Sequence, residues 1–387
     1  MDTDSNPALA ANIARVIGTA GGRIPFSVFM QMALYDPDHG YYTTVGRPER
    51  DYRTSPQVHQ LFGTLIARQL EQMWNVIGRP QEFAAVEMGA GDGRLCGQVL
   101  GYCSQSAPPF FRRLRYLIVE ASPTQRERQR ASLTEFEGKV EWREQPVGAW
   151  VEGGINGCFL SNELVDAFPV HRAIVAEGLL RELYVTCMGD GFGEVAGPPS
   201  MPQLSAYFER LGLSLAEGTC AEVNLDALRW MREVGRALGR GFVITIDYGY
   251  PAEELFSRPQ GSLVCYFRQR YSDNPYVRVG QQDITSHVDF TSLVLEGQQA
   301  GLRPTAMLAQ SDFLRNLGIE AFNQRKDLSS AAFYDQKFAI RELTDPNGLG
   351  RFKVLLQHKG LREPALDALN PCNGRKRKLW AQMAGRR

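Results

Sequence analysis

The stretch that decides the fold is Phe83-Ala-Ala-Val-Glu-Met-Gly-Ala-Gly-Asp-Gly-Arg94. An apolar run ends in Glu87, and glycines then occupy every second position, at Gly89, Gly91 and Gly93. A helix-compatible stretch follows. A strand that breaks into a glycine turn and then a helix creates a ligand site at the carboxyl end of the strand. Because glycine has no Cβ atom, such a turn lets a ligand lie against the backbone.

The glycine spacing distinguishes two kinds of cofactor. Dinucleotide binding requires Gly-x-Gly-x-x-Gly, with the pyrophosphate on the helix N-terminus. Counted from Gly89, the sixth position is Arg94, which breaks that pattern and argues against a dehydrogenase. A carboxylate at Glu87 followed by alternate glycines suits a cationic cofactor without phosphates, such as S-adenosylmethionine (SAM). The alternative is a glycine-rich turn that binds nothing.

The next predicted strand, residues 115–120, also ends in a carboxylate, and a helical segment begins at Ser122. Glu120 lies within the sequence range of a ribose-binding acid. Its two oxygens can accept hydrogen bonds from both ribose hydroxyls. The alternative is a solvated surface charge.

Composition restricts the class of protein. The chain has 387 residues, with 43 basic and 43 acidic side chains, so net charge does not point to nucleic acid. Its seven cysteines include no Cys-x-x-Cys pair, which predicts neither a zinc site nor a disulfide framework; no metal is expected. Without a long apolar segment or a signal-peptide pattern, we expect no membrane span and a cytoplasmic location.

Alternating patterns predict an α/β fold with a mostly parallel sheet. The expected strands cover residues 83–88, 115–120, 139–142, 157–161 and 242–248, with late strands at 261–267 and 352–358 that close the sheet. We predict a helical N-terminal cap over 1–80, a main α/β domain over 81–360 with an insertion at about 171–222, and a basic tail over 361–387. The insertion is expected to hold a hairpin over 170–185 and a loop over 189–200.

Helical spacing covers residues 9–17 and 26–34 of the predicted cap. After a polar loop, Ser55 is expected to cap a further helix that has Pro56 at its first position and runs to about Ile77. A later helix is expected over 224–238.

A third cluster of polar side chains follows the buried strand that ends at Ser161. The residues directly after it include Asn162, Glu163 and Asp166. At this position in a doubly wound sheet, side chains project into the ligand crevice. If a helical turn begins here, Glu163 and Asp166 share one face and could accept a cationic group. The alternative is helix capping by Asn162, with two acids at the N-terminal dipole.

Together these blocks make the chain resemble the MidA-type methyltransferases, the family that includes the mitochondrial complex I assembly factor. The resemblance extends from about residue 24 to 358. It is carried by Phe29-Met-x-x-Ala-Leu-Tyr-Asp-Pro-Asp-His-Gly-Tyr-Tyr42, Thr54-Ser-Pro56, Glu87-x-Gly-x-Gly-x-Gly93, Glu120-x-Ser122, Asn162-Glu-Leu-Val-Asp-Ala-Phe-Pro-Val170, Ile246-Asp-Tyr-Gly249 and Asp283-Ile-Thr-Ser-His-Val-Asp-Phe290. One departure is that residues 266–272 contain no histidine.

The resemblance implies a class I (Rossmann-like) SAM-dependent fold and a helical N-terminal segment packed over the cofactor. It also implies a cofactor role for the residues that match the family motifs: Thr54, Ser55, Pro56, Glu87, Gly89, Gly91, Gly93, Glu120, Ser122 and Asn162. Mitochondrial relatives methylate an arginine on a complex I subunit, so a protein substrate, possibly a respiratory complex subunit, is the expected partner.

An arginine acceptor stays protonated at neutral pH, and its charge must lie beside the cationic sulfonium of SAM. We expect Glu163 and Asp166 to offset that repulsion and to orient the guanidinium. His287 and Asp289 could act as a proton acceptor and its orienting partner, or form a structural contact. Two other functions stay open: methylation of a small molecule, and an assembly factor that binds SAM but turns over little.

Overall fold

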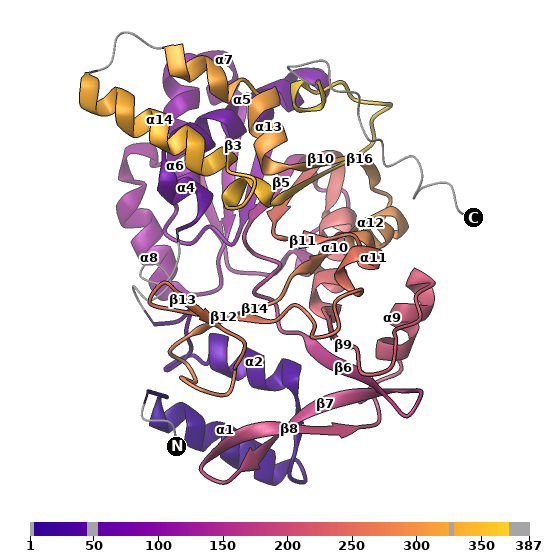
Figure 1. Ribbon diagram of the computed structural model, residues 1–387. Coiled ribbons are helices and arrows are strands. Elements are labelled where there is room, and N and C mark those ends of the chain that lie inside the picture. The colour runs from indigo at the N-terminus through magenta and orange to yellow at the C-terminus, as the bar shows by residue number, and fades with distance from the viewer. Residues whose placement is uncertain (1–3, 45–52, 325–328, 371–387) are drawn as a thin grey trace. The chain divides into compact units, whose positions relative to one another are not determined.

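The computed structural model describes residues 4–44, 53–324 and 329–370 of the chain (Figure 1). The chain divides into two compact units. Unit 1 comprises Met1–Arg53, Val165–Arg229 and Gly249–Leu293, and unit 2 comprises Thr54–Leu164, Trp230–Tyr248 and Val294–Arg387. Each unit is therefore assembled from segments that lie far apart in the sequence.

Unit 2 is built around one sheet, which in the described residues has seven strands in the order β16-β17-β10-β5-β2-β3-β4. The strands are β2 (Phe83–Met88), β3 (Leu114–Val119), β4 (Val140–Arg143), β5 (Ile155–Asn162), β10 (Leu238–Asp247), β16 (Arg303–Ala309) and β17 (Lys353–Lys359). The run from β4 to β10 is parallel, whereas β17 is antiparallel to both of its neighbours. The predicted α/β fold with a mostly parallel sheet is confirmed.

The predicted positions of the late strands are partly wrong. Lys353–Lys359 joins the main sheet as expected, but residues 261–267 do not. That segment forms β12 (Val264–Phe267), which pairs with β13 (Arg270–Ser272) and β14 (Asp283–Thr285) in unit 1. The edge of the main sheet is instead β16, which was not predicted. An apolar run of residues that favour strands indicates a strand, but the strand with which it pairs depends on segments elsewhere in the chain.

Helices cover the sheet of unit 2 and bury its apolar side chains. They are α4 (Ser55–Val58), α5 (Leu61–Val76), α6 (Arg94–Ser106), α7 (Pro108–Arg113), α8 (Pro123–Ser132), α13 (Gln310–Asn316) and α14 (Ser330–Thr344). One core cluster joins side chains of α5, α6, α13 and α14 to alternate residues of the strands, such as Phe83 and Ala85, or Phe242 and Ile244. This period of two is the one that places every second strand residue on the same face of a sheet.

Short 3₁₀ helices lie at Thr134–Phe136, Val147–Ala149, Ile319–Gln324, Leu349–Arg351 and Asp367–Leu369. The helices α10 (Leu225–Ala237) and α12 (Phe290–Gln299) each contain a boundary between the two units. α10 matches the helix predicted over 224–238.

The helix predicted from Pro56 to Ile77 is interrupted. His59 is extended (φ −166°, ψ 152°) and separates α4 from α5. Its Nδ1 accepts a hydrogen bond from the Leu61 N–H at 3.1 Å, so the imidazole serves an amide of the first turn of α5. The predicted cap was also one residue late: the N-cap of α4 is Thr54, whose N–H donates to Gln57 Oε1 at 3.0 Å in a capping box.

Unit 1 contains the N-terminal helices and the inserted segment. Its helices are α1 (Pro7–Thr19), α2 (Phe26–Tyr35), α9 (Gln203–Leu211) and α11 (Ala252–Leu255). In the described residues, one sheet has the order β1-β7-β6-β9, with β8 paired to β7. Its strands are β1 (Ile24–Pro25), β6 (His171–Ala176), β7 (Leu179–Met188), β8 (Gly191–Gly197) and β9 (Cys220–Val223), and β11 (Gly249–Tyr250) pairs separately with β15 (Val288–Asp289).

The insertion is more regular than the sequence suggested. The hairpin predicted over 170–185 is present as β6 and β7. The loop predicted over 189–200 is wrong for most of its length, because residues 191–197 form β8, which pairs with β7 over seven positions. The compact units also divide the chain differently from the predicted domains: residues 54–80 belong to unit 2, whereas residues 249–293 belong to unit 1 with the insertion.

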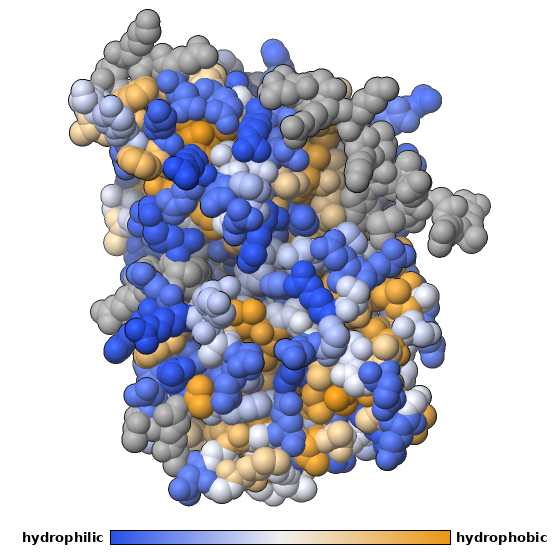
Figure 2. All heavy atoms as spheres, viewed as in Figure 1, coloured by the Kyte–Doolittle hydropathy of each residue, from blue (hydrophilic) through white to orange (hydrophobic). Residues whose placement is uncertain are grey.

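No helix in the described residues is long and apolar enough to cross a membrane. Of the basic tail predicted over 361–387, the part beyond residue 370 lies outside the described residues, and the part before it contains the 3₁₀ helix Asp367–Leu369. On the face drawn in Figure 2, hydrophilic side chains are interspersed with smaller hydrophobic areas. The large hydrophobic side chains that are exposed come from several elements, including α2, β7 and α14. Surface hydropathy therefore does not single out a substrate site.

Candidate active site

The glycine turn between β2 and α6 has the conformation that its sequence demands. Gly89, Gly91 and Gly93 have φ angles of +75°, +52° and +82°. Residues other than glycine rarely adopt these left-handed φ angles, because their Cβ atom then crowds the backbone. Gly93 is also the N-cap of α6. Alternate glycines thus allow the chain to reverse from strand to helix within a few residues.

The three glycines differ in the space beside them. A Cβ atom at Gly89 would lie 3.0 Å from Leu164 Cδ1, and one at Gly93 would lie 3.1 Å from Leu133 Cδ1. A Cβ at Gly91 would meet no described heavy atom within 4 Å. Gly91 therefore lies where the backbone borders open space, as a turn that carries a ligand against its backbone requires.

Glu87, near the end of β2, is buried beneath this turn. Its Oε2 accepts a hydrogen bond from the Tyr116 hydroxyl at 2.7 Å. Burial raises the pKa of Glu87 to about 7, against the lowering effect of the Tyr116 hydrogen bond, and Asp92 raises it further. Near neutral pH this carboxyl is therefore partly ionised, and a cationic ligand beside it would favour the charged form.

Glu120 follows β3 directly, at the same edge of the sheet. Its Oε1 accepts from the Ser122 N–H at 2.8 Å, and its Oε2 lies 3.5 Å from Gln129 Nε2. Burial raises the pKa of Glu120, while its hydrogen bonds with Ser122 and Gln129 lower it. Ser122 is the N-cap of α8 and accepts from the Gln125 N–H at 3.3 Å. The hydroxyl of Ser122 thus has a structural task beside its predicted cofactor role.

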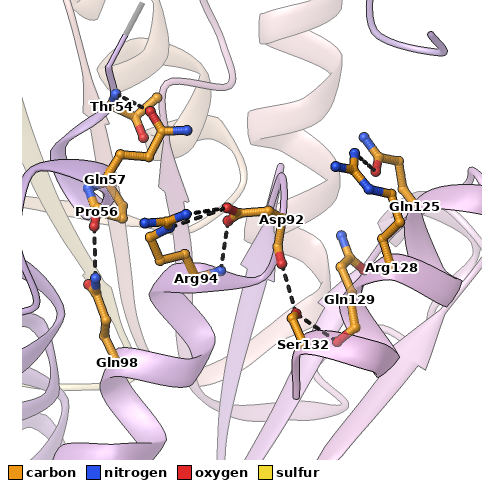
Figure 3. A network of polar contacts seen from close by, with 10 residues as sticks. All are labelled: Thr54, Pro56, Gln57, Asp92, Arg94, Gln98, Gln125, Arg128, Gln129 and Ser132. Carbon is orange, nitrogen blue, oxygen red and sulfur yellow. Dashed lines mark hydrogen bonds and ion pairs between the residues drawn. The ribbon is translucent and has the colours of Figure 1, made fainter. Parts of the chain in front are cut away.

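The Thr54-Ser-Pro56 segment lies against α6. The carbonyl of Pro56 accepts from Gln98 Nε2 at 2.7 Å, as Figure 3 shows. The Ser55 N–H donates to Glu163 Oε1 at 3.3 Å, and the buried Ser55 hydroxyl lies 3.2 Å from Gln310 Oε1. Three separate segments of unit 2 therefore fix this short stretch beside the helix that begins at the glycine turn.

Asn162 is the last residue of β5. Its Nδ2 donates to Glu163 Oε1 at 2.9 Å. Its Oδ1 is buried and has no hydrogen-bond partner in the described structure. A buried acceptor without a donor is costly, so this oxygen is suited to a donor supplied by a ligand.

Glu163 has an unusual backbone conformation. Its φ is +53°, a strained angle for a residue with a side chain. The Glu163 N–H donates to the Ile246 carbonyl at 2.9 Å, and the next N–H, of Leu164, donates to Asp247 Oδ2 at 3.3 Å. These contacts hold the chain in the left-handed conformation directly after β5.

The helical turn considered for residues 162–166 is wrong: the chain forms turns and bends over residues 163–168. Neither a shared helical face nor a helix cap therefore describes the two acids. Glu163 belongs to unit 2 and Asp166 to unit 1. Asp166 is buried, and its carbonyl accepts from the Ser286 N–H at 3.0 Å. Whether the two carboxylates act together stays a prediction.

His287 and Asp289, both in unit 1, have other partners. Arg258 Nη1 lies 3.3 Å from His287 Nδ1, and the guanidinium stacks on Tyr250, whose ring also contacts the imidazole. Because a guanidinium can only donate, His287 Nδ1 must accept, which places the proton on Nε2. This tautomer weakens its predicted role as a proton acceptor.

Asp289 acts as a cap for α12. Its Oδ1 accepts from the Thr291 and Ser292 N–H groups, and its Oδ2 accepts from the Tyr207 and Ser292 hydroxyls at 2.7 and 2.6 Å. Burial raises the pKa of Asp289, and these hydrogen bonds lower it. The arrangement favours the structural alternative over an orienting role toward His287.

Three polar residues that hold the site together were not predicted from the sequence: Tyr116, Gln98 and Gln129. A detectable signal existed only for Gln129. It lies in a strongly polar helix, four residues before Leu133 at the helix C-cap, which is the spacing of a buried face. In the described residues, no group of three or more His, Cys, Asp or Glu side chains could hold a metal ion.

Comparison with known proteins supports the interpretation of the glycine turn as part of a SAM site. A family model described as "Putative S-adenosyl-L-methionine-dependent methyltransferase" matches residues 65–307. The chain belongs to this methyltransferase family. The resemblance to MidA-type methyltransferases is thereby confirmed, and SAM is the cofactor. When bound, SAM supplies an electrophilic methyl group; the open space at Gly91 and the unpaired Oδ1 of Asn162 fit such a ligand.

Two curated relatives and one solved structure cover most of the chain. The chain is 27% identical to "Protein arginine methyltransferase NDUFAF7 homolog, mitochondrial" of Drosophila melanogaster, over 92% of this chain and 85% of that protein. It is 25% identical to "Protein arginine methyltransferase NDUFAF7, mitochondrial" of Homo sapiens, over 77% of this chain and 71% of that protein. A "likely methyl transferase from Burkholderia thailandensis bound to S-adenosyl-homocysteine" is 31% identical, with a TM-score of 0.84 and 94% coverage of both chains.

Gly91→Val is expected to abolish SAM binding, because the side chain would fill the open space beside the turn. Gly78→Val is a matched control: Gly78 also has a positive φ (+92°) and nothing within 4 Å of the place a Cβ atom would take, but it lies outside the turn. Both variants should lose stability, by about 1–2 kcal/mol from backbone strain, and only Gly91→Val should lose binding by calorimetry. A folded Gly91→Val protein with normal affinity would show that the turn is only structural.

Glu120→Ala is expected to weaken SAM binding, because both ribose acceptors are removed. Leaving buried hydroxyls unpaired costs about 1–3 kcal/mol, or roughly 5- to 150-fold in affinity. Glu127→Ala, an exposed acid on the following helix, should change affinity little. Equal affinities for Glu120→Ala and the wild type in calorimetric titration would exclude the ribose role.

Glu87 should make SAM affinity depend on pH. Because the carboxylate form of Glu87 favours a cationic ligand, SAM affinity should fall as the pH drops below about 7, which is the pKa of Glu87 in the unliganded protein. Glu87→Gln should bind more weakly at pH 7.5 and lose most of this dependence between pH 5.5 and 7.5. Profiles of equal slope for the two proteins would contradict an interaction between Glu87 and the cofactor's charge.

Proposed function

We propose that this SAM-dependent methyltransferase is a protein arginine N-methyltransferase whose acceptor is a subunit of a respiratory complex. The observation that carries the proposal is the position of Glu163. Met88, the last residue of β2, lies opposite Ser161 on the parallel neighbour β5. Glu163 therefore leaves β5 at the same edge of the sheet at which the glycine turn leaves β2.

The charge of the acceptor explains why a carboxylate is needed there. An arginine side chain keeps its proton at neutral pH, so its guanidinium is repelled by a sulfonium in a site with little water. A carboxylate offsets that repulsion and can hold two guanidinium nitrogens by parallel hydrogen bonds. Glu163 Oε1 already accepts from the Ser55 N–H and from Asn162 Nδ2, which orients the carboxylate before substrate binds.

The names of the relatives support the same acceptor class. The curated proteins from insect and human are named protein arginine methyltransferases, and they match across most of this chain. Asp166 enters the proposal as a second carboxylate, three residues after Glu163. Transfer requires one guanidinium nitrogen to lie in line with the methyl group and the sulfur, so the principal contribution of these acids is orientation and charge.

The variant Glu163→Gln/Asp166→Asn tests the proposal, because it keeps the shape of both side chains and removes their charge. SAM affinity should change little, whereas methyl transfer should fall by about a hundredfold or more, since only the acceptor and the transition state use these charges. The measurement is single-turnover transfer of labelled methyl from SAM, with extract from cells that lack this chain as acceptor and mass spectrometry of the labelled product.

Glu209→Gln/Asp190→Asn is the matched control, because it removes two exposed charges elsewhere on unit 1. Near-normal labelling by the Glu163→Gln/Asp166→Asn variant would reject the acidic clamp. Label found only in small molecules would favour a small-molecule methyltransferase. SAM binding with retained binding of a client protein, but without transfer by the wild type, would favour an assembly factor.

A further inference from the structure

Gln129 on α8 is fully buried although its helix is otherwise polar. The helix reads Pro123-Thr-Gln-Arg-Glu-Arg-Gln-Arg-Ala-Ser132, and Gln129 has an exposed fraction of 0%. Burying an amide is costly unless its polar atoms find partners. Gln129 makes such contacts at both ends of its amide, and the identities of the partners define what the side chain does.

The orientation of the Gln129 amide is fixed by Trp142 on β4. The indole Nε1 lies 3.0 Å from Gln129 Oε1. An indole N–H can donate but cannot accept, so it requires the amide oxygen, and not the nitrogen, on its side. The NH₂ group of Gln129 must then face the opposite way, toward the glycine turn and Glu120.

The NH₂ group contacts two parts of the cofactor site. Gln129 Nε2 donates to the Gly91 carbonyl at 2.9 Å and lies 3.5 Å from Glu120 Oε2. One helical turn later, Ser132 Oγ donates to the Asp92 carbonyl at 3.0 Å, as Figure 3 shows. α8 therefore holds two consecutive carbonyls of the turn, and its residue Gln129 also reaches the predicted ribose acid.

We propose that Gln129 is a positioning residue that joins the glycine turn and the Glu120 carboxylate into one arrangement and thereby sets the affinity for SAM. This inference rests on the SAM-binding part of the proposed function and adds a residue to it. The two hydrogens of one amide are shared between the turn and Glu120, so a displacement of either contact displaces the other. The same contact favours the ionised form of Glu120, because an N–H donor stabilises a carboxylate.

Gln129→Met keeps the length of the side chain and removes every polar contact. We expect SAM affinity, measured by calorimetry, to fall by about ten- to a hundredfold, the effect of losing a hydrogen bond to a charged group. Gln125→Met is the matched control on the same helix: its side chain contacts Arg128, away from the turn, and its affinity should stay within about twofold of the wild type.

A double-mutant cycle separates positioning from simple destabilisation. If Gln129 acts through Glu120, the loss caused by Gln129→Met should be at least about fivefold smaller when Glu120→Gln is already present. In the single variant, the pH dependence of SAM affinity should also move toward higher pH, because Glu120 loses a hydrogen bond that favours its charged form. Losses that multiply independently, with an unchanged pH profile, would overturn the proposal.

Trp142→Phe provides a second test that leaves Gln129 in place. Without the indole donor the Gln129 oxygen loses its hydrogen bond and the amide is held only through its NH₂ group, so affinity should fall in the same direction but by less than in Gln129→Met. If Gln129→Met does not fold, as judged by circular dichroism, the outcome rests on this variant: unchanged affinity in folded Trp142→Phe would overturn the proposal. A wild-type protein that fails to bind SAM would instead contradict the proposed function.

Discussion

Parallel pairing of β2, β3 and β5 is the constraint on which the site in unit 2 depends. Met88 lies opposite Val119 on one side and Ser161 on the other, so the three strands end at one edge. The glycine turn, Glu120 and Asn162 are the residues that directly follow or end these strands. Hydrogen bonding between parallel strands fixes their relative positions, and groups separated by many residues in sequence therefore lie at a common edge.

The glycine turn is stabilised by contacts from other segments of unit 2. Its three glycines have left-handed backbone angles, and two of its carbonyls accept hydrogen bonds from a helix that follows a different strand. Gln129 and Ser132 donate to Gly91 and Asp92 from α8, while Gln98 on α6 holds the segment at Pro56. Satisfying these carbonyls makes the turn rigid before a ligand arrives, which reduces the entropy lost on binding.

Buried and half-buried carboxylates in this protein have different tasks, and their partners distinguish them. Burial raises the pKa of Glu87, Glu120 and Asp289 alike. Both oxygens of Asp289 are engaged by amides and hydroxyls of its own helix and of Tyr207, which is the pattern of a cap. Glu87 and Glu120 also have protein partners, but they lie beside a turn with open space, where a cationic or hydroxyl-bearing ligand would supply further partners. A raised pKa by itself therefore does not identify a cofactor residue.

The sequence by itself determined the strand, the glycine turn and the helix after it, because glycine spacing and apolar runs act over a few residues. It also placed Glu120 at the end of its strand, within one residue of the observed end of β3 at Val119. Only the tertiary structure decided that residues 264–267 leave the main sheet, that the chain after Asn162 turns without forming a helix, and that Gln129 reaches the turn. These outcomes depend on hydrogen-bond partners in other elements of the fold, such as Asp247 for the chain after Asn162 and Trp142 for Gln129. Local pattern carries no information about such partners.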